Sequence, residues 1–477
     1  MNKQPVTTRP ALKQAMALAT VTFLAGCSLV PTYQRPDAPV ATQWPASTKV
    51  SPADSKNAKQ NAPVQAWQDY FSDPALRQLI DTALTNNRDL RVALLNIEQA
   101  RAQLGIRRAD QLPTVNAAMS GARTPNSSGA ITSTYSAGLT VTAYELDFFG
   151  RVASLKEQAL AQFLASAEAA QTVQISLIST VAQSWLSLLA DETLLDVTRQ
   201  TLASRAESLK LVELKLQHGA ASEFDLRNAQ TLLESTRVTL AQQMRQRALD
   251  ENALGLLLGQ TISDAQRAQW TSSKLEQLVF AELPAGLPSD LLTRRPDIRQ
   301  AEQLLVASNA NIGAARAAFF PRISLTAGVG SASSALGDLF KGGSWGWTLA
   351  PQMVLPIFDA GRNQANLEAA RAGRDIAVAQ YEKAIQSAFR EVADGLASRA
   401  TLLEQLQAQQ ALLNAETARS QLAQLRLTHG VASQLDWLDA QRTLFAAQQA
   451  MVQTRLASLQ NQIALFKTLG GGPAVTQ

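Results

Sequence analysis

The chain has 477 residues, of which 5% are aromatic and 17% are charged, a composition that argues against a set of ordinary globular domains. Lys and Arg number 43 against 39 Asp and Glu, but three of the basic and none of the acidic residues lie in residues 1–26. Without that segment, 40 basic residues face 39 acidic ones, so the sequence pI of about 9.2 gives no support for binding to nucleic acid.

Residues 1–26 are predicted to be a signal peptide. Lys3, Arg9 and Lys13 give it a positively charged start, and a short apolar run follows from Ala15 to Phe23. Because this run is too short to span a bilayer as a permanent helix, its layout is that of a cleavable export signal. It ends in Leu24-Ala25-Gly26-Cys27, with small residues directly before the only cysteine in the chain.

A single cysteine excludes an internal disulfide, and an incidental buried thiol is the alternative interpretation of Cys27. The segment resembles a bacterial lipobox, which implies that Cys27 becomes the acylated first residue of the mature protein. Ser28 follows, where an aspartate would resemble an inner-membrane retention signal. We therefore expect a lipid anchor in the outer membrane, followed by an extended N-terminal segment over residues 27–72, rich in Pro, Ala, Ser and Thr.

After the signal, no run of about 20 uninterrupted apolar residues occurs, so no transmembrane helix is expected. The chain is instead built twice. Residues 212–233 return as residues 423–444, with ten of the 22 positions identical. Two long copies indicate a duplicated domain rather than a solenoid. The predicted divisions are a first repeat at 73–259, a connector at 260–288, a second repeat at 289–470 and a C-terminal tail at 471–477.

Each copy is predicted to contain a helix, two strands, a very long helix and a returning helix. In the first copy a helix is expected from Pro74 to Asp110, where Pro113 stops it. Alternating apolar and polar residues, as in membrane barrel strands, then predict strands at 114–122, 134–148, 322–331 and 345–357. A soluble sheet is the alternative.

The long helices are the most unusual feature. Arg151 to His218 and Arg362 to His429 each cover 68 residues, which at 1.5 Å per residue is roughly 100 Å. Leu202, Leu209 and Leu216 have heptad spacing, which predicts coiled-coil packing at the far end. Returning helices are expected at 222–258 and 433–469.

The two hairpin turns carry the same local signals. Gly219 and Gly430 stand where each long helix is expected to end in a left-handed residue. Ser222 and Ser433, each followed three residues later by an aspartate, predict capping boxes for the returning helices. The only two histidines directly precede the glycines, and we expect them to act at the helix ends and not as metal ligands.

Four strands cannot close a barrel, and an open sheet edge in lipid would leave backbone groups without partners. The chain must therefore oligomerise, with barrel and helical tunnel shared between copies. Long helices joined to a barrel predict a conduit across the periplasm.

Several motifs resemble the TolC-type outer-membrane efflux proteins, in particular the OprM branch of lipid-anchored multidrug channels, over nearly the whole mature chain. They span residues 144–151 (YELDFFGR), 287–298 (LPSDLLTRRPDI), 314–321 (AARAAFFP), 355–362 (LPIFDAGR) and 467–472 (KTLGGG). The resemblance implies a mainly α fold with a membrane β-barrel and a trimeric α-barrel tunnel. It also implies a homotrimer that works with a periplasmic adaptor and an inner-membrane pump of the resistance-nodulation-division type.

The resemblance also implies a periplasmic gate at Leu435, Asp439 and Arg442. Positions i and i+4 share a helix face, so three copies would give an apolar ring and a negative ring. The alternative is that Leu435 packs in the coiled coil and Asp439 is a solvated charge. Adaptor docking is expected at the hairpin tips, at Gly219–Ser222 and Gly430–Ser433.

The sequence gives no sign of an enzyme: it has no paired-carboxylate cleft signal, no phosphate-binding glycine loop and no His/Cys metal spacing. We expect no cofactor beyond the covalent lipid on Cys27. The predicted function is the passive outer-membrane exit duct of a tripartite pump for drugs and other small toxic compounds. A type I-like protein secretion duct and a lipid-anchored coiled-coil spacer remain alternatives.

Overall fold

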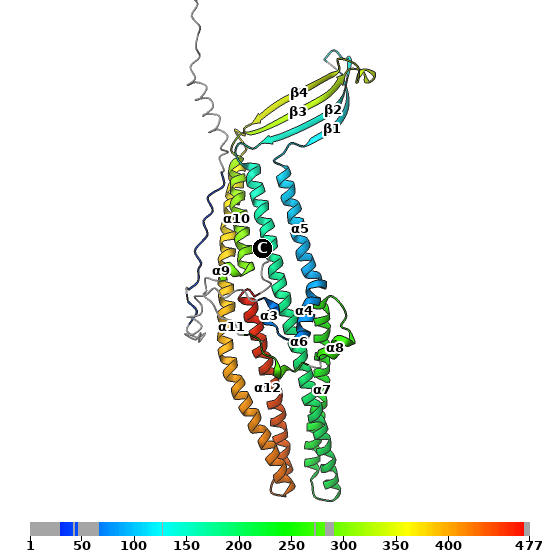
Figure 1. The fold of residues 1–477 in the computed structure, drawn as a ribbon, viewed down its shortest axis with the longest axis vertical. Helices are drawn as coiled ribbons and strands as arrows, with labels where there is room; N and C mark the ends of the chain where they lie inside the picture. Colours follow the sequence, from blue (N-terminus) through cyan, green and yellow to red (C-terminus); the bar gives the residue numbers. More distant parts are fainter. Residues whose placement is uncertain are drawn as a thin grey trace, which may run out of the picture. The chain divides into compact units, whose positions relative to one another are not determined.

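The computed structural model describes residues 29–41, 43–45, 66–125, 127–270, 273–281 and 291–471 (Figure 1). The predicted signal peptide and Cys27 lie outside these ranges. Contacts divide the chain into two compact units, one made of residues 1–37, 96–167 and 300–382, the other of residues 38–95, 168–299 and 383–477. Each unit contains segments of both predicted repeats. The compact units therefore do not coincide with the two repeats, and the repeat boundaries stay a prediction.

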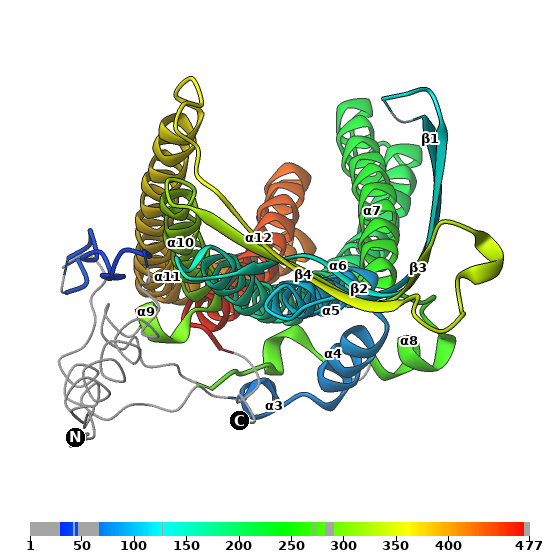
Figure 2. The same cartoon turned by 90° about the horizontal axis from the view of Figure 1, so that it is seen from above.

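The first unit contains a four-stranded antiparallel sheet that is strongly curved (Figure 2). Its strands lie in chain order: β1 (Val115–Pro125), β2 (Ile131–Leu146), β3 (Arg322–Ser333) and β4 (Trp345–Val354). All four predicted strands are present, with ends displaced by up to three residues. The edge strands β1 and β4 are exposed along their whole length, so none of the described residues covers either of them.

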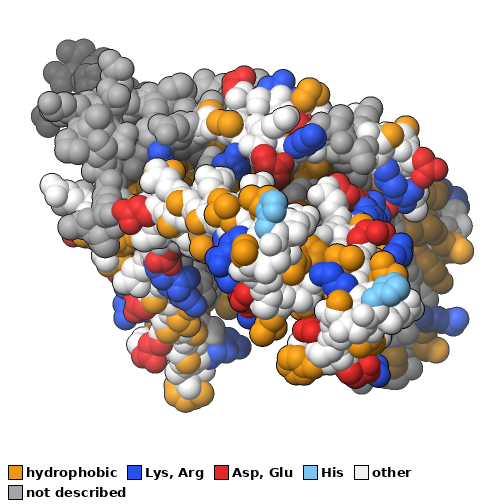
Figure 3. Space-filling model, turned by 90° about the horizontal axis from the view of Figure 1, so that it is seen from below, with side chains coloured by type: hydrophobic (Ala, Val, Ile, Leu, Met, Phe, Trp, Pro, Cys, Tyr) orange, Lys and Arg blue, Asp and Glu red, His pale blue; other side chains and the backbone are white. Residues whose placement is uncertain are grey.

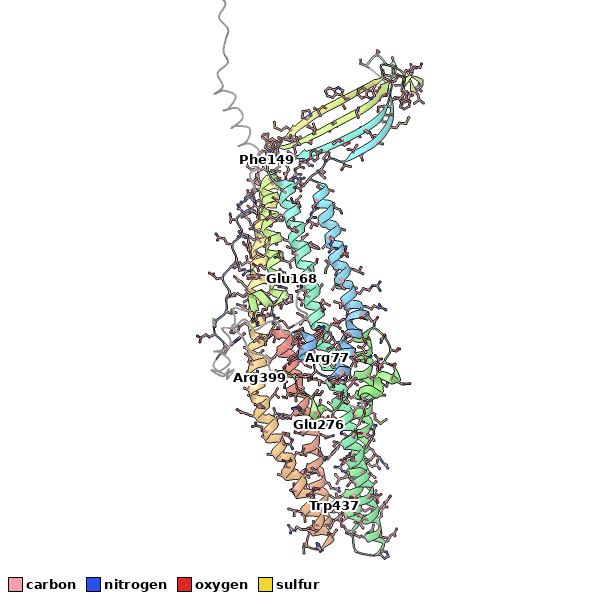
Figure 4. The ribbon with its side chains drawn as sticks, viewed as in Figure 1. Arg77, Phe149, Glu168, Glu276, Arg399 and Trp437 are labelled. Carbon is pink, nitrogen blue, oxygen red and sulfur yellow. The ribbon has the colours of Figure 1, made fainter. Side chains whose placement is uncertain are left out.

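Ion pairs join this sheet to the helix that follows it. Glu145 near the end of β2 is bonded to Arg151, the first residue of α6, at 2.7 Å and to Arg322, the first residue of β3, at 2.8 Å. The rings of Phe149 and Phe320 stack beside them, 4.8 Å apart, and Phe149 is labelled in Figure 4. The sequence motifs at residues 144–151 and 314–321 therefore meet at this junction.

The remaining elements are helical. They are α3 (Trp67–Tyr70), α4 (Pro74–Asn86), α5 (Arg88–Ala109), α6 (Arg151–Gln217), α7 (Glu223–Leu258), α8 (Asp264–Trp270), η2 (Leu275–Gln277), α9 (Leu291–Arg294), α10 (Pro296–Ala317), η4 (Leu336–Asp338), α11 (Arg362–Thr428) and α12 (Gln434–Thr468). The long helices α6 and α11 have 67 residues each, one fewer than predicted.

The prediction of one helix from Pro74 to Asp110 is wrong at Asn87. There the backbone is extended (φ −62°, ψ 131°), and α4 ends before α5 begins. The Asn87 side chain accepts a hydrogen bond from the Leu90 amide at 2.9 Å and donates one to the Leu257 carbonyl of α7 at 2.9 Å. Asparagine is a favoured helix cap, and here it also satisfies the backbone of a neighbouring helix.

The core of the second unit lies where α3, α4, α6, α7 and α12 meet. Tyr70 stacks on Phe466 with centroids 4.6 Å apart and on Phe280 with centroids 5.6 Å apart, and Phe71 packs edge-on against all three rings. In the described chain, α6 is the one helix long and apolar enough to cross a membrane by composition, although none was expected. Because 61% of its most apolar window is buried, this composition fits a core helix, which supplies Trp185 among others.

The helices pack where the coiled coil was predicted, but some of the buried side chains are polar. Val212 of α6 is buried against Ala229 of α7 and Leu438 of α12, with Leu209 packed beside it. One and two turns earlier, however, the buried positions are the polar residues Ser208 and Arg205. The packing of these hairpins is therefore partly polar.

Candidate functional site

Both hairpins end in the same turn. Gly219 and Gly430 have φ values of 70° and 73°, the left-handed conformation predicted for them. The next residue in each turn, Ala220 or Val431, donates its backbone N–H to the carbonyl five residues back, at 2.7 and 2.9 Å. This is the Schellman arrangement, which satisfies carbonyls that a helix end otherwise leaves free.

The returning helices begin with the predicted capping boxes. Ser222 accepts a bond from the Asp225 amide at 3.1 Å and its own amide donates to the Asp225 carboxylate at 3.0 Å; Ser433 and Asp436 make the same pair of bonds. The hydrogen bonds from the serines lower the pKa of both aspartates. Seen from below, the hairpin region presents both histidines among charged and hydrophobic side chains (Figure 3).

Asp439, one turn after Leu435 on α12, is the centre of an ionic network. Its carboxylate accepts hydrogen bonds from Arg419 of α11 at 2.6 Å and from Arg442 at 2.5 Å. The Arg419 hydrogen bond, with the positive charge of Arg442, lowers the pKa of Asp439. Thr443 extends the network by donating to Glu416 at 2.6 Å, and Glu416 also pairs with Arg419. Asp439 is thus more than an isolated solvated charge.

Leu435 is about half exposed among the described residues. Its residue exposure is 53%, whereas Trp437 and Leu438, which follow it, are buried. Trp437 lies near the hairpin end of α12 (Figure 4). The helix therefore buries one side and leaves Leu435 about half exposed, and the gate at Leu435 stays a prediction.

The sequence analysis missed the partners Glu416, Arg419 and Thr443. A signal for them exists, because residues that face each other in an antiparallel hairpin are about equally far from its turn. Arg419 precedes Gly430 by 11 residues and Asp439 follows it by nine. Counting outward from the turn along both helices would have predicted that Arg419 and Asp439 face each other.

A second polar contact joins α12 to the other hairpin. Arg205 of α6 is buried, donates to the Leu232 carbonyl at 3.0 Å and to the Thr236 hydroxyl of α7 at 2.5 Å, and lies over the Phe445 ring of α12 at 5.1 Å. Burial lowers its pKa, and the described residues offer it no carboxylate. Gln441 of α12 also donates to Ser204 of α6 at 3.3 Å.

Comparison with known proteins identifies the family. The sequence profile described as outer membrane efflux protein matches residues 79–260 and 287–471. Two Pseudomonas putida proteins are each 50% identical to the chain over 468 residues, which covers 96% of this chain and 96% of each relative. They are the antibiotic efflux pump outer membrane protein ArpC and the toluene efflux pump outer membrane protein TtgC. The chain belongs to the outer membrane efflux protein family.

A solved structure agrees with this assignment. The open state of the Neisseria gonorrhoeae MtrE outer membrane channel is 38% identical, with a TM-score of 0.84 over 94% of this chain and 98% of that one. The predicted resemblance and TolC-type fold class are thereby confirmed. The protein is an outer-membrane efflux channel component, from a family of channels rather than enzymes.

Proposed function

We propose that the chain forms the exit duct of a tripartite efflux pump, as a homotrimer docked to a periplasmic adaptor and an inner-membrane pump of the resistance-nodulation-division type. The names of the two relatives favour antibiotics and aromatic solvents as the transported class. The uncovered edges β1 and β4 support oligomerisation, because strand edges in lipid need hydrogen-bond partners that another copy can supply.

The gate proposal rests on one observation: an exposed Leu435 and an ion-paired Asp439 lie on the same face of α12. In a trimer, three leucines would form an apolar constriction, and three aspartates one turn away would form a negative ring. Arg419 ties each aspartate to α11, and Arg442 partly neutralises it. Opening then requires the ends of α11 and α12 to move outward together.

The hairpin tips are the proposed adaptor contacts. Gly219 and Ser222 on one hairpin and Gly430 and Ser433 on the other form short turns whose backbone groups are satisfied internally. Small side chains at these positions leave room for close approach by a partner helix. For anchoring, we propose an acyl group on Cys27 as the only covalent addition.

Single-channel conductance in a planar bilayer tests the gate. Leu435→Ala combined with Asp439→Ala is expected to raise the conductance of the purified trimer. The duplication supplies a matched control, because Phe224 and Asn228 occupy the same positions on the first hairpin. Phe224→Ala with Asn228→Ala should leave conductance unchanged. An unchanged conductance in the first double variant would exclude the gate, and a chain without any conductance would be a spacer.

The partners require separate experiments. Crosslinking in cells followed by purification of the trimer should recover an adaptor and an inner-membrane pump; recovery of a protein-secretion transporter would replace the efflux assignment with secretion. Metabolic labelling with palmitate should mark the wild-type chain and not Cys27→Ser. Equal labelling of both would place the lipid elsewhere.

A further inference from the structure

The start of the described chain is held along one helix of the first unit. Residues 29–35 follow α10 without regular secondary structure, and two α10 side chains bind their backbone. Arg316 donates to the Leu29 carbonyl at 3.1 Å, and Asn309 donates to the Pro31 carbonyl at 2.7 Å. We call residues 29–35 the strap. It lies within the extended N-terminal segment predicted for residues 27–72, for which no docking to a helix was predicted.

The contacting residues form one face of α10. Positions 302, 309, 313 and 316 are separated by seven, four and three residues, the spacing at which helical side chains align. At Gly313 a Cβ atom would come within 2.5 Å of a Val30 methyl group and 3.1 Å of the Val30 Cα. The strap therefore lies against the helix at a distance that only glycine permits.

Glu302 receives the far end of the strap. Its carboxylate accepts two bonds from Arg35, each of 2.7 Å, and one from the Tyr33 hydroxyl at 3.1 Å. The Glu302 side chain is only 11% exposed. In the part of the chain that the structure describes, no other residue pairs with it. Burial raises the pKa of Tyr33, so its hydroxyl keeps the proton that it donates.

We propose that the strap is a docking element with Glu302 as its receiving residue, and that it fixes the position of the membrane anchor. Arg316, which holds Leu29, lies in the last turn of α10, six residues before the start of β3. Cys27 lies two positions before Leu29, a reach of at most roughly 7 Å. An acyl chain on Cys27 would then enter the bilayer beside the base of the sheet. This last step rests on the proposed lipid attachment.

The strap can be tested by spin labelling of the full-length protein in detergent. Thr32→Cys introduces a thiol at an exposed strap position, and the electron paramagnetic resonance spectrum should be that of an immobilised label. Glu302→Ala and Arg35→Ala should each make it mobile, and the double variant should add nothing to Glu302→Ala, because loss of Glu302 already removes the Arg35 contact together with the Tyr33 bond. The control is Glu98→Ala, an exposed glutamate that pairs with an arginine at 2.8 Å in the same unit.

Gly313→Ala supplies a steric test that leaves every charge in place. Alanine favours the helix by about 1 kcal/mol over glycine. Its Cβ atom would also come within 2.6 Å of the Ser154 hydroxyl oxygen of α6, so release of the label is assigned to displacement of Val30 when circular dichroism shows that the variant keeps its helices. Chymotrypsin cleavage after Tyr33 should accelerate roughly ten- to hundredfold in Glu302→Ala, the range expected when a charge-assisted bidentate bond is lost.

Two results would overturn the proposal: a mobile label in the parent protein, or an immobile label in both Glu302→Ala and Gly313→Ala. If Glu302→Ala no longer yields trimers, Arg35→Lys and Gly313→Ala decide the question. Whether Cys27 is acylated is measured separately from docking of the strap. Protein with the natural Thr32 takes up label only if the Cys27 thiol is free, whereas docking of the strap is measured whether or not Cys27 is acylated.

Discussion

Asp191→Asn is expected to stabilise the protein above neutral pH. Asp191 of α6 is 7% exposed, and its Oδ2 atom is buried without a hydrogen-bond partner among the described residues. Burial raises the pKa of Asp191 to about 7, and the neighbouring carboxyl group of Asp250 adds to this rise. Asparagine has nearly the same shape and no charge, so it imitates the protonated acid.

The sign of the effect follows from proton binding. Because the folded pKa of Asp191 lies above its ordinary value of 3.8, its contribution to stability is complete below about pH 4 and is lost as the pH rises through 7. At about 1.4 kcal/mol per pKa unit, the whole change is on the order of 4 kcal/mol. Roughly 2.5 kcal/mol of it falls between pH 5 and pH 8. The variant should lack this part of the pH dependence.

Chemical unfolding of the detergent-solubilised protein, followed by far-UV circular dichroism at pH 5 and pH 8, measures the difference. Asp196→Asn is the control, because Asp196 lies on the same helix with a side chain 69% exposed. It should keep the wild-type pH dependence. The reasoning is refuted if Asp191→Asn keeps it too, or if this variant is less stable than wild type at pH 8.

Other predictions concern packing and turns. Leu254→Ala, at a fully buried position, should cost about 3 kcal/mol of unfolding free energy, while Leu256→Ala, 80% exposed, should change it by less than about 0.5 kcal/mol in the same assay. Gly430→Ala should cost about 1–2 kcal/mol because its φ is 73°, and Ser433→Ala about 1 kcal/mol through loss of the cap. Both should speed amide exchange at the hairpin end without altering the sheet. Asn87→Ala should cost about 1–2 kcal/mol by removing a cap and a bond to α7, seen as a lower unfolding midpoint.

Local signals made the hairpins predictable, and distant contacts limited the rest. Gly219 with Ser222, and their repeats, set the helix ends through bonds within a few residues, so sequence spacing was sufficient to place them. Asn87 was missed because its cap is combined with a bond to α7, 170 residues away. The strap was missed for the same reason, since its partner Glu302 lies 267 residues from Arg35.

The two hairpins of the duplicated chain differ in the positions of their charged residues. The offset of 211 that relates the repeats pairs Arg205 with Glu416, Ser208 with Arg419, Asn228 with Asp439 and Thr231 with Arg442. The first hairpin thus has one buried arginine, and the second has an ionic network whose arginines are about half exposed or more. Exposed ion pairs contribute only about 0–1 kcal/mol each, so exchanging their partners costs little.

Moving a buried charge away from its partners is far more costly, on the order of 3–5 kcal/mol when it is left uncompensated. Arg205 holds α6 to α7 and contacts Phe445 of α12, so the first hairpin should stay fixed while the second moves past it. This difference in cost is the physical reason to expect a conductance change from Leu435 and Asp439 and none from the matching positions on the first hairpin.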